Sequence, residues 1–289
     1  HEAHFAAVLA EHALPGGNNP ILGFIWDGTG LGHDGHVWGG ECFRYDGHRF
    51  ERAGQLAYFD FILGDKMPRE PRISALAIAG STPGAADWLR PKFSEQEWRV
   101  YRRLLSATPS LQSSSVGRLF DATASLLGVM DRSSYEGEAA MRLEQLALRF
   151  LRPRGLDAAA PFDAAALMDG ATWDGRRLLA MAAAARRRGE DAAWIAARFH
   201  RTLAEIVRLS IRHLEAGTAC FSGGVFQNEL LVDLIIHLIG GETRLFFHEQ
   251  LSPNDENVSL GQIAFQLCGA PAVVPGSGRV LPLGKQREK

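Results

Sequence analysis

The stretch ILGFIWDGTGLGHDGHVWGGECFRYDGHRFERAGQL, at residues 21–56, decides the fold of this chain. It begins with an apolar run of strand length, passes through a glycine-rich segment and continues with two alternating runs. Asp46 and Gly47 lie between those two runs, and such a dipeptide between alternating segments is a strong signal for a β-hairpin. The stretch therefore predicts a strand, a glycine-rich turn, a strand, a tight turn and a third strand.

Most of the remaining chain shows the apolar spacing of helices. Residues 1–14 place Phe5, Val8 and Leu9 on one face of a first helix. Further helices are predicted at residues 65–105, 118–129, 137–151, 192–217 and 258–269. Prolines interrupt the helical pattern of the first of these segments.

Strands are also predicted near the end of the chain. Residues 218–241 (TACFSGGVFQNELLVDLIIHLIGG) indicate a buried strand, a glycine turn and a helix, and residues 243–249 indicate another strand. A short strand or two is expected within residues 152–178. A hairpin layer followed by helices and strand–turn–helix units predicts an α/β fold with a mixed sheet.

The composition excludes several classes of protein. The 289 residues carry a formal net charge of −2, with acids and bases interspersed, so neither nucleic acid nor a membrane surface is expected as a partner. No apolar run approaches the ~18–20 residues of a membrane span, and no basic-then-apolar leader begins the chain. Cys42, Cys220 and Cys268 lack metal or disulfide spacing and are expected to be small buried residues. The sequence predicts a cytoplasmic protein.

The segment FSGGVFQN contains a first glycine turn. Gly223 and Gly224 follow an apolar run and precede a predicted helix, so the backbone can approach a nucleotide closely and helix N–H groups favour an anion. Asn228 is expected in the first turn of that helix, where it could hydrogen-bond a base, ribose or phosphate. A plain tight turn is the alternative.

The loop after Asp27 contains a second glycine turn. Glycine occupies four of the eight positions 28–35, which is more than a hairpin tip needs and suggests backbone wrapped round a ligand. Thr29 offers a hydroxyl group there. Asp27, at a strand end, suits a metal or a water bound to it, and capping of its own loop is the alternative.

Histidines raise the question of a metal site. His1 and His4 share a helical face at i, i+3, although i, i+4 is the commoner spacing for helical metal ligands. Asp255, in a turn before the last helix, is a candidate carboxylate partner. Other histidines lie on or near the hairpin tip and are expected to be exposed to solvent: His33, His36 and His48.

Acidic side chains begin the helix at residues 137–151. Glu138 in YEGE either complements the positive end of the helix dipole or binds a ribose diol. Asp121 in GRLFDA allows the same two interpretations.

Taken in order, seven stretches resemble the C-terminal part of the carbamoyltransferase HypF family: HEAHFAAVLAEH, WDGTGLGHDGHVWGGE, GRLFDATASLLG, YEGEAAMRLE, RFHRTLAE, SGGVFQNELL and PNDENVSLGQ. The resemblance implies a TsaD-like domain of the actin/Hsp70/sugar-kinase fold over residues 1–275, followed by a basic tail at 276–289. Residues 1–17 would be a remnant helix of an incomplete first lobe, and residues 18–275 the remaining strands and helices.

The resemblance also implies an activity. The family uses carbamoyl phosphate and ATP to make a carbamoyl-adenylate, and passes the carbamoyl group to the C-terminal cysteine thiol of HypE during [NiFe]-hydrogenase maturation. The expected cofactors are therefore ATP or carbamoyl-adenylate and a divalent metal, which could be iron, zinc or magnesium. The expected partners are HypE and an upstream YrdC-like domain, with no nucleic acid and no membrane.

Three metal-binding and catalytic residues are carried over by the resemblance. HEAH matches the last four residues of the family's HHxAH motif, which makes His4 a ligand, while His1 matches the intervening histidine and is a poor substitute for the missing first ligand. Asp27 and Asp255 match the family's carboxylates. The last loop departs from the family's NDGG, since Glu256 and Asn257 stand where two glycines are expected.

The same resemblance implies a set of nucleotide-binding residues: Gly28, Thr29, Gly30, Gly117, Asp121, Gly137, Glu138, Ser222, Gly223, Gly224 and Asn228. Three alternatives remain for the function: an O-carbamoyltransferase acting on a small-molecule hydroxyl, an inert nucleotide- or partner-binding fragment, and a sugar or acetate kinase of the same fold.

Overall fold

A mixed sheet is the centre of the structure, a computed structural model that describes residues 1–14, 19–106 and 111–267. Within those ranges six strands follow the order β4–β5–β2–β1–β8–β9, and β3 pairs with β2. The strands of this sheet are β1 (Ile21–Leu31), β2 (Val37–Tyr45), β3 (Phe50–Gln55), β4 (Phe59–Asp60), β5 (Gln112–Ser113), β8 (Thr218–Ser222) and β9 (Arg244–Phe246). The predicted α/β class with a mixed sheet is confirmed.

The pairing of β1 explains the mixture of directions. Strand β1 is antiparallel to β2 and parallel to β8, and β8 is parallel to β9. Strands β2 and β3 form the predicted hairpin, in which the Asp46 carboxylate accepts from the backbone N–H groups of His48 and Arg49, both at 2.8 Å. The three strands expected from residues 21–56 are therefore confirmed.

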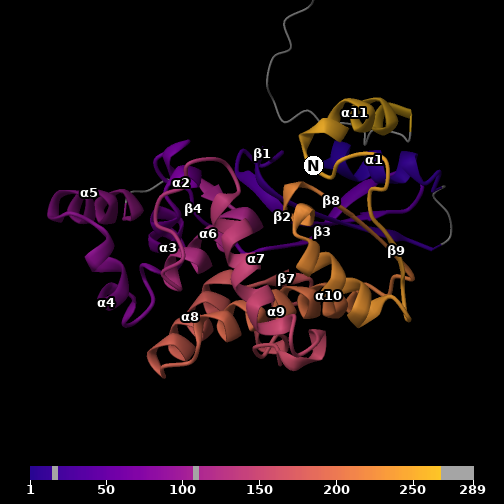
Figure 1. Cartoon of the computed structure of the whole chain (residues 1–289). Coiled ribbons are helices and arrows are strands. Elements are labelled where there is room, and N and C mark those ends of the chain that lie inside the picture. Colours follow the sequence, from indigo (N-terminus) through magenta and orange to yellow (C-terminus); the bar gives the residue numbers. More distant parts are fainter. Residues whose placement is uncertain (15–18, 107–110, 268–289) are drawn as a thin grey trace, which may run out of the picture.

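Both faces of β1 are buried, because successive side chains of a strand point to opposite sides. Leu22, Phe24 and Trp26 pack into the larger hydrophobic cluster with most of the helices. Ile21 and Ile25 pack into a smaller cluster with the first helix. The sheet thus separates two apolar layers, and Figure 1 shows helices on either side of it.

Helices cover both faces of the sheet. They are α1 (Glu2–Glu11), α2 (Lys66–Arg69), α3 (Pro71–Ala79), α4 (Ala85–Leu89), α5 (Glu95–Leu105), α6 (Val116–Leu126), α7 (Glu138–Leu151), α8 (Gly175–Arg187), α9 (Ala192–His213), α10 (Glu229–Ile239) and α11 (Val258–Leu267). A small second sheet pairs β6 (Met168–Asp169) with β7 (Thr172–Trp173). The short strands expected within residues 152–178 are therefore confirmed.

Helix α1 lies between the central sheet and α11 (Figure 1). Its residues Phe5, Val8 and Leu9 are buried, together with Ile25 of the sheet and Ala264 of α11. The two helices approach very closely: a Cβ atom added at Gly261 would lie 2.0 Å from the carbonyl oxygen of Ala3. Only glycine permits this distance between backbones.

The turn after β8 differs from the sequence expectation. The helix was expected directly after Gly223 and Gly224, but a 3₁₀ turn, Gly224–Gln227, comes first, and Asn228 is the N-cap of α10. Gly223 has φ of +98°, a conformation that favours glycine. The amide groups beside the glycine pair are therefore those of a 3₁₀ turn and not of an α-helix.

Other expectations concern burial and membranes. Cys42 and Cys220 are buried as predicted, and burial raises the pKa of both thiols. Cys268 and the predicted basic tail lie outside the described residues. Within the described part of the chain, every helix is too short or too polar to cross a membrane.

The Gly261→Ala substitution is expected to destabilise the fold by about 1–3 kcal/mol, because the added methyl group forces α1 and α11 apart. Unfolding in urea measures the change. Gly241→Ala is the matched control, since a Cβ atom there meets nothing within 4 Å. Equal stabilities of the two variants would contradict the close packing of the two helices.

Candidate cation and nucleotide site

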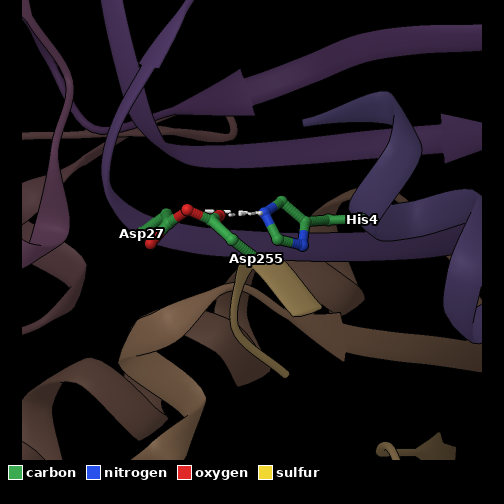
Figure 2. Close-up of side chains that lie close together, drawn as sticks. All are labelled: His4, Asp27 and Asp255. Atoms are coloured by element: carbon green, nitrogen blue, oxygen red, sulfur yellow. Dashed lines mark ion pairs between the residues drawn. The ribbon is translucent and has the colours of Figure 1, made fainter. Parts of the chain in front are cut away.

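Three side chains from distant parts of the sequence converge beside the sheet (Figure 2). His4 comes from α1, Asp27 from the irregular part of β1, and Asp255 from the turn before α11. The Nε2 atom of His4 lies 3.4 Å from Asp27 Oδ2 and 3.4 Å from Asp255 Oδ1. One ligand atom from each residue lies within 4.8 Å of the others.

Asp27 is held in one orientation by backbone amides. Its Oδ1 atom accepts from Gly28 N at 2.8 Å and from Gly224 N at 3.2 Å, which leaves Oδ2 to face His4. Burial raises the pKa of Asp27, but the hydrogen bonds with His4 and with the two glycine amides outweigh it and hold the pKa below its ordinary value. The carboxylate is therefore ionised and its free oxygen points into the cluster.

The donor set fits a divalent cation. One imidazole nitrogen and two carboxylate oxygens are ligands that zinc, iron and manganese accept, and two negative charges offset the charge of the ion. The opposite ring nitrogen of His4 is occupied, since Nδ1 lies 2.9 Å from Asn257 Oδ1. His1 points elsewhere: its Nε2 lies 3.7 Å from Glu41 Oε2.

Glycine backbone and a buried arginine lie beside Asp27. Ser115, the N-cap of α6, donates to Gly28 O at 2.5 Å and accepts from Arg118 N at 3.1 Å. A Cβ atom at Gly117 would lie 3.0 Å from the Gly28 Cα. The structure thus brings Gly28 and Gly117 into contact, although they belong to different elements.

Arg118 and Asp121 form a buried charged pair next to this backbone. Arg118 Nε lies 3.0 Å from Asp121 Oδ2, but Arg118 Nε and Nη1 and Asp121 Oδ2 have no hydrogen-bond partner among the described residues. Burial raises the pKa of Asp121 to about 6, with Arg118 opposing and the exposed Glu136 adding to the rise. Buried polar atoms without hydrogen bonds are rare in native folds, so this pair is a candidate for contact with a ligand or an ordered water.

Asn228 has partners at both ends of its amide. Its oxygen accepts from Leu231 N at 2.8 Å, and its nitrogen lies 3.2 Å from His200 Nε2. His200 Nδ1 in turn lies 2.8 Å from the Ala196 carbonyl oxygen. Asn228 therefore caps α10 and contacts a fully buried histidine.

The remaining nucleotide-binding candidates are spread around the cluster. Ser222 is buried at the end of β8, and a Cβ atom at Gly223 would lie 2.3 Å from the Trp26 carbonyl oxygen. Thr29 is exposed, and the His1 ring covers Gly30.

Glu138 and Gly137 lie at the start of α7, where Gly137 is the N-cap. The Glu138 carboxylate accepts from Ser134 N and Oγ at 2.7 and 2.9 Å, and from Arg142 at 2.8 Å. These bonds lower the pKa of Glu138, the Ser134 amide most strongly. Both carboxylate oxygens are thus bonded within the helix start, and the diol interpretation of Glu138 would require those bonds to open.

Sequence reasoning did not single out Arg118, Glu11 or His248 as site residues. Asn257 was noted only as a departure from a glycine pattern, yet it is fully buried and bonded to His4. A signal for Arg118 existed in its position next to Gly117. No comparable sequence signal marks Glu11, whose contacts lie with His248 and the residues after it.

The fold and the site together define a class: an α/β protein with a histidine–carboxylate cluster beside glycine-rich backbone. The family described as "Carbamoyltransferase, Kae1-like Domain, second subdomain" matches residues 23–262. The chain therefore belongs to the HypF carbamoyltransferase family.

Curated relatives agree with this assignment. Carbamoyltransferase HypF2 of Cupriavidus necator is 35% identical over 94% of this chain and 36% of its own length. Carbamoyltransferase HypF of Rhodobacter capsulatus is 35% identical over 91% of this chain and 34% of its own length. The chain thus spans about a third of the length of these relatives.

Solved structures agree as well. A crystal structure of full-length HypF in the phosphate- and nucleotide-bound form matches 92% of this chain and 35% of its own, with a TM-score of 0.79 and 25% identity. The crystal structure of T.kodakarensis HypF matches 93% of this chain and 36% of its own, with a TM-score of 0.79 and 27% identity. The Kae1-like fold is confirmed.

The Asp255→Asn substitution is expected to weaken binding of Mn²⁺ or Zn²⁺ at least about tenfold. Substitution of residues that only contact the ligands commonly lowers metal affinity by this much, so the loss of a ligand should cost no less. The side chain is 91% exposed, so the fold should tolerate the change. Isothermal titration calorimetry gives the affinities. Glu256→Gln, a neutralised neighbour, is the control, and equal affinities of the two variants would remove Asp255 from the cation site.

The His200→Gln substitution is expected to change how stability depends on pH. Burial lowers the pKa of His200 from 6.5 to about 4, so below pH 6.5 the unfolded chain binds a proton that the folded chain does not. Stability from this group is complete above pH 6.5 and falls by about 3 kcal/mol between pH 6.5 and pH 4, below which it changes no further.

Glutamine does not titrate, so the difference between wild type and variant isolates this contribution in urea unfolding curves at pH 7.5 and pH 4.5. His213→Gln, at the exposed end of the same helix, serves as the control. Parallel losses of stability in wild type and His200→Gln would show that His200 is not buried as a neutral ring.

Proposed function

We propose that this chain is the part of a HypF-type enzyme that transfers the carbamoyl group from carbamoyl-adenylate to the C-terminal cysteine thiol of HypE. Membership of the HypF carbamoyltransferase family supports the reaction class. The single observation that carries the proposal is the convergence of His4, Asp27 and Asp255 beside the amides of Gly28 and Gly224.

The reaction requires little covalent chemistry from the chain. The thiolate of the acceptor attacks the carbonyl carbon of the carbamoyl-adenylate, a C–S bond forms, the C–O bond to the phosphate breaks, and AMP leaves. A nucleophile from this chain is not needed, because the acceptor supplies it. The chain must hold the adenylate, orient its carbonyl group and stabilise the phosphate that leaves.

His4, Asp27 and Asp255 would hold a divalent cation, which would polarise the carbonyl group and neutralise the departing phosphate. Asp27 is suited to this role since Gly28 and Gly224 already fix its other oxygen. The metal's identity is left open among iron, zinc and magnesium.

Arg118 and Asp121 would hold the nucleotide beside Gly28. Arg118 is 4% exposed and has N–H groups without hydrogen-bond partners in the described residues, which suits a phosphate oxygen. Asp121 Oδ2, which is ion-paired with Arg118 but has no hydrogen bond among the described residues, suits a ribose hydroxyl. Glu136 lies close enough to Asp121 to raise its pKa and could accept a second hydroxyl.

The first test is whether nucleotide binding depends on the cation. The wild-type chain is expected to bind ATP more tightly with Mn²⁺ than with a chelator, and Asp27→Asn is expected to remove this difference. Glu2→Gln, on the same helix as His4, is the control for a neutralised carboxylate. An ATP affinity that changes neither with Mn²⁺ nor with the Asp27→Asn substitution would contradict the proposed site.

The second test addresses the acceptor. This chain replaces the corresponding part of Rhodobacter capsulatus HypF, and the chimaera receives radioactive carbamoyl phosphate, ATP and HypE. We expect the label on the C-terminal cysteine of HypE, and none when the chimaera carries Asp27→Asn. Label on a small-molecule hydroxyl compound, with none on HypE, would overturn the acceptor and favour an O-carbamoyltransferase.

A further inference from the structure

A line of hydrogen bonds begins at Glu11, two helical turns from His4 on the same face of α1. Glu11 Oε1 accepts from the backbone N–H groups of Glu249, Gln250 and Leu251 at 3.0, 2.7 and 3.3 Å, and Oε2 lies 2.5 Å from His248 Nδ1. Burial raises the pKa of Glu11, but the bonds from Gln250, His248 and the other amides lower it to about 2. An ionised carboxylate can only accept, so His248 Nδ1 carries the proton.

The next member of the line is the opposite nitrogen of His248. Two possible donors face His248 Nε2, which suits a neutral ring whose single proton is on Nδ1, and burial, which lowers the pKa of His248, favours the same form. The Nε2 atom lies 2.9 Å from Ser222 Oγ and 3.2 Å from Asn257 Nδ2, both of which can donate.

The surroundings of Asn257 then determine which way its amide points. Its nitrogen lies 2.9 Å from the Ser252 carbonyl oxygen, which can only accept, and 3.2 Å from both Ser222 Oγ and His248 Nε2. The Ser252 carbonyl oxygen and His248 Nε2 can only accept, so they require the NH₂ group on this side, and its two hydrogens serve these two acceptors. The amide oxygen therefore faces His4 Nδ1, at 2.9 Å.

An acceptor at 2.9 Å from His4 Nδ1 requires a proton on that atom. Nε2 is then the ring atom left for a cation, and it is the one that faces Asp27 and Asp255. Each donor in this line is determined by the acceptor before it, from the Glu11 carboxylate to the histidine ligand.

We propose that Glu11, His248 and Asn257 are positioning residues that hold His4 with its proton on Nδ1, so that Nε2 is presented to a divalent cation. The inference rests on the proposed cation site and adds residues that touch neither the cation nor the substrate. Partners beyond the ligands commonly set the protonation and orientation of a metal-binding histidine in this way.

The test reads the proton positions directly, by ¹H–¹⁵N NMR of the histidine rings at pH 8, in the metal-free chain and with Zn²⁺ alone. In wild type we expect a proton on Nδ1 of both His248 and His4, and Zn²⁺ on Nε2 of His4. Asn257→Leu is expected to lose the protected Nδ1 proton of His4 and to weaken Zn²⁺ binding about 10–100-fold.

Glu11→Gln is the second variant and acts at the other end of the line. Its amide oxygen would turn to the three backbone N–H groups, so its NH₂ group would face His248 Nδ1 and move the ring proton of His248 to Nε2. Glu2→Gln is the matched control, since Glu2 lies on the same helix and bonds the exposed His33. That control should leave the protons of His4 and His248 in place.

Two results would overturn the proposal: a wild-type His248 or His4 without a proton on Nδ1, or an Asn257→Leu chain that keeps both the His4 proton and the Zn²⁺ affinity. If wild type binds no Zn²⁺ but shows both Nδ1 protons, the cation site fails while the hydrogen-bond line stands. If wild type binds Zn²⁺ and the protons lie elsewhere, the site stands and the positioning role fails.

Discussion

The close packing of α1 between the central sheet and α11 is the constraint on which the candidate site depends. His4 sits between Ala3, whose carbonyl oxygen lies against Gly261, and Phe5, whose ring lies against Gly23 of the sheet. Both neighbours of His4 are therefore fixed by contacts in which a Cβ atom would not fit. The backbone at His4 is positioned by apolar packing, and its polar contacts need only orient the ring.

Electrostatics are consistent with the proposed binding of a cation and a nucleotide at one site. Asp27 and Asp255 bring two negative charges to one imidazole, and hydrogen bonds with His4 and with the amides of Gly28 and Gly224 hold the pKa of Asp27 low despite burial. A divalent ion balances this excess and would be the largest local charge. Beside Gly28, the next residue after Asp27, the buried Arg118 carries N–H groups of a kind that suits a phosphate. A phosphate between an ion and a guanidinium group is thus a physically consistent arrangement.

Much of the fold could be predicted from sequence, because its signals are local. The hairpin at Asp46–Gly47 follows from its turn chemistry, and the mixed sheet follows from a hairpin joined to a strand–turn–helix unit. The grouping of His4, Asp27 and Asp255 was expected from the resemblance to the HypF family, since spacing alone could not show that the three side chains meet. The 3₁₀ turn before α10 was missed, since a strand–glycine–helix pattern does not reveal where the helix begins.

What could not be predicted depends on several positions at once. Asn257 orients His4 only because Ser252 and His248 fix which end of its amide faces the ring. Neither contact can be recognised from the sequence around Asn257. Glu138 is the opposite case. The sequence suggested that its carboxylate could bind a ligand, but in the structure the carboxylate is bonded to Ser134 and Arg142.

The central claim is that His4, Asp27 and Asp255 hold one cation jointly. Anomalous diffraction from crystals soaked in Zn²⁺ tests it most directly. The account predicts an ion about 2.0–2.2 Å from Nε2 of the histidine on α1 and from a carboxylate oxygen of each aspartate. An ion bound elsewhere, with that imidazole still unligated at saturating Zn²⁺, would contradict it.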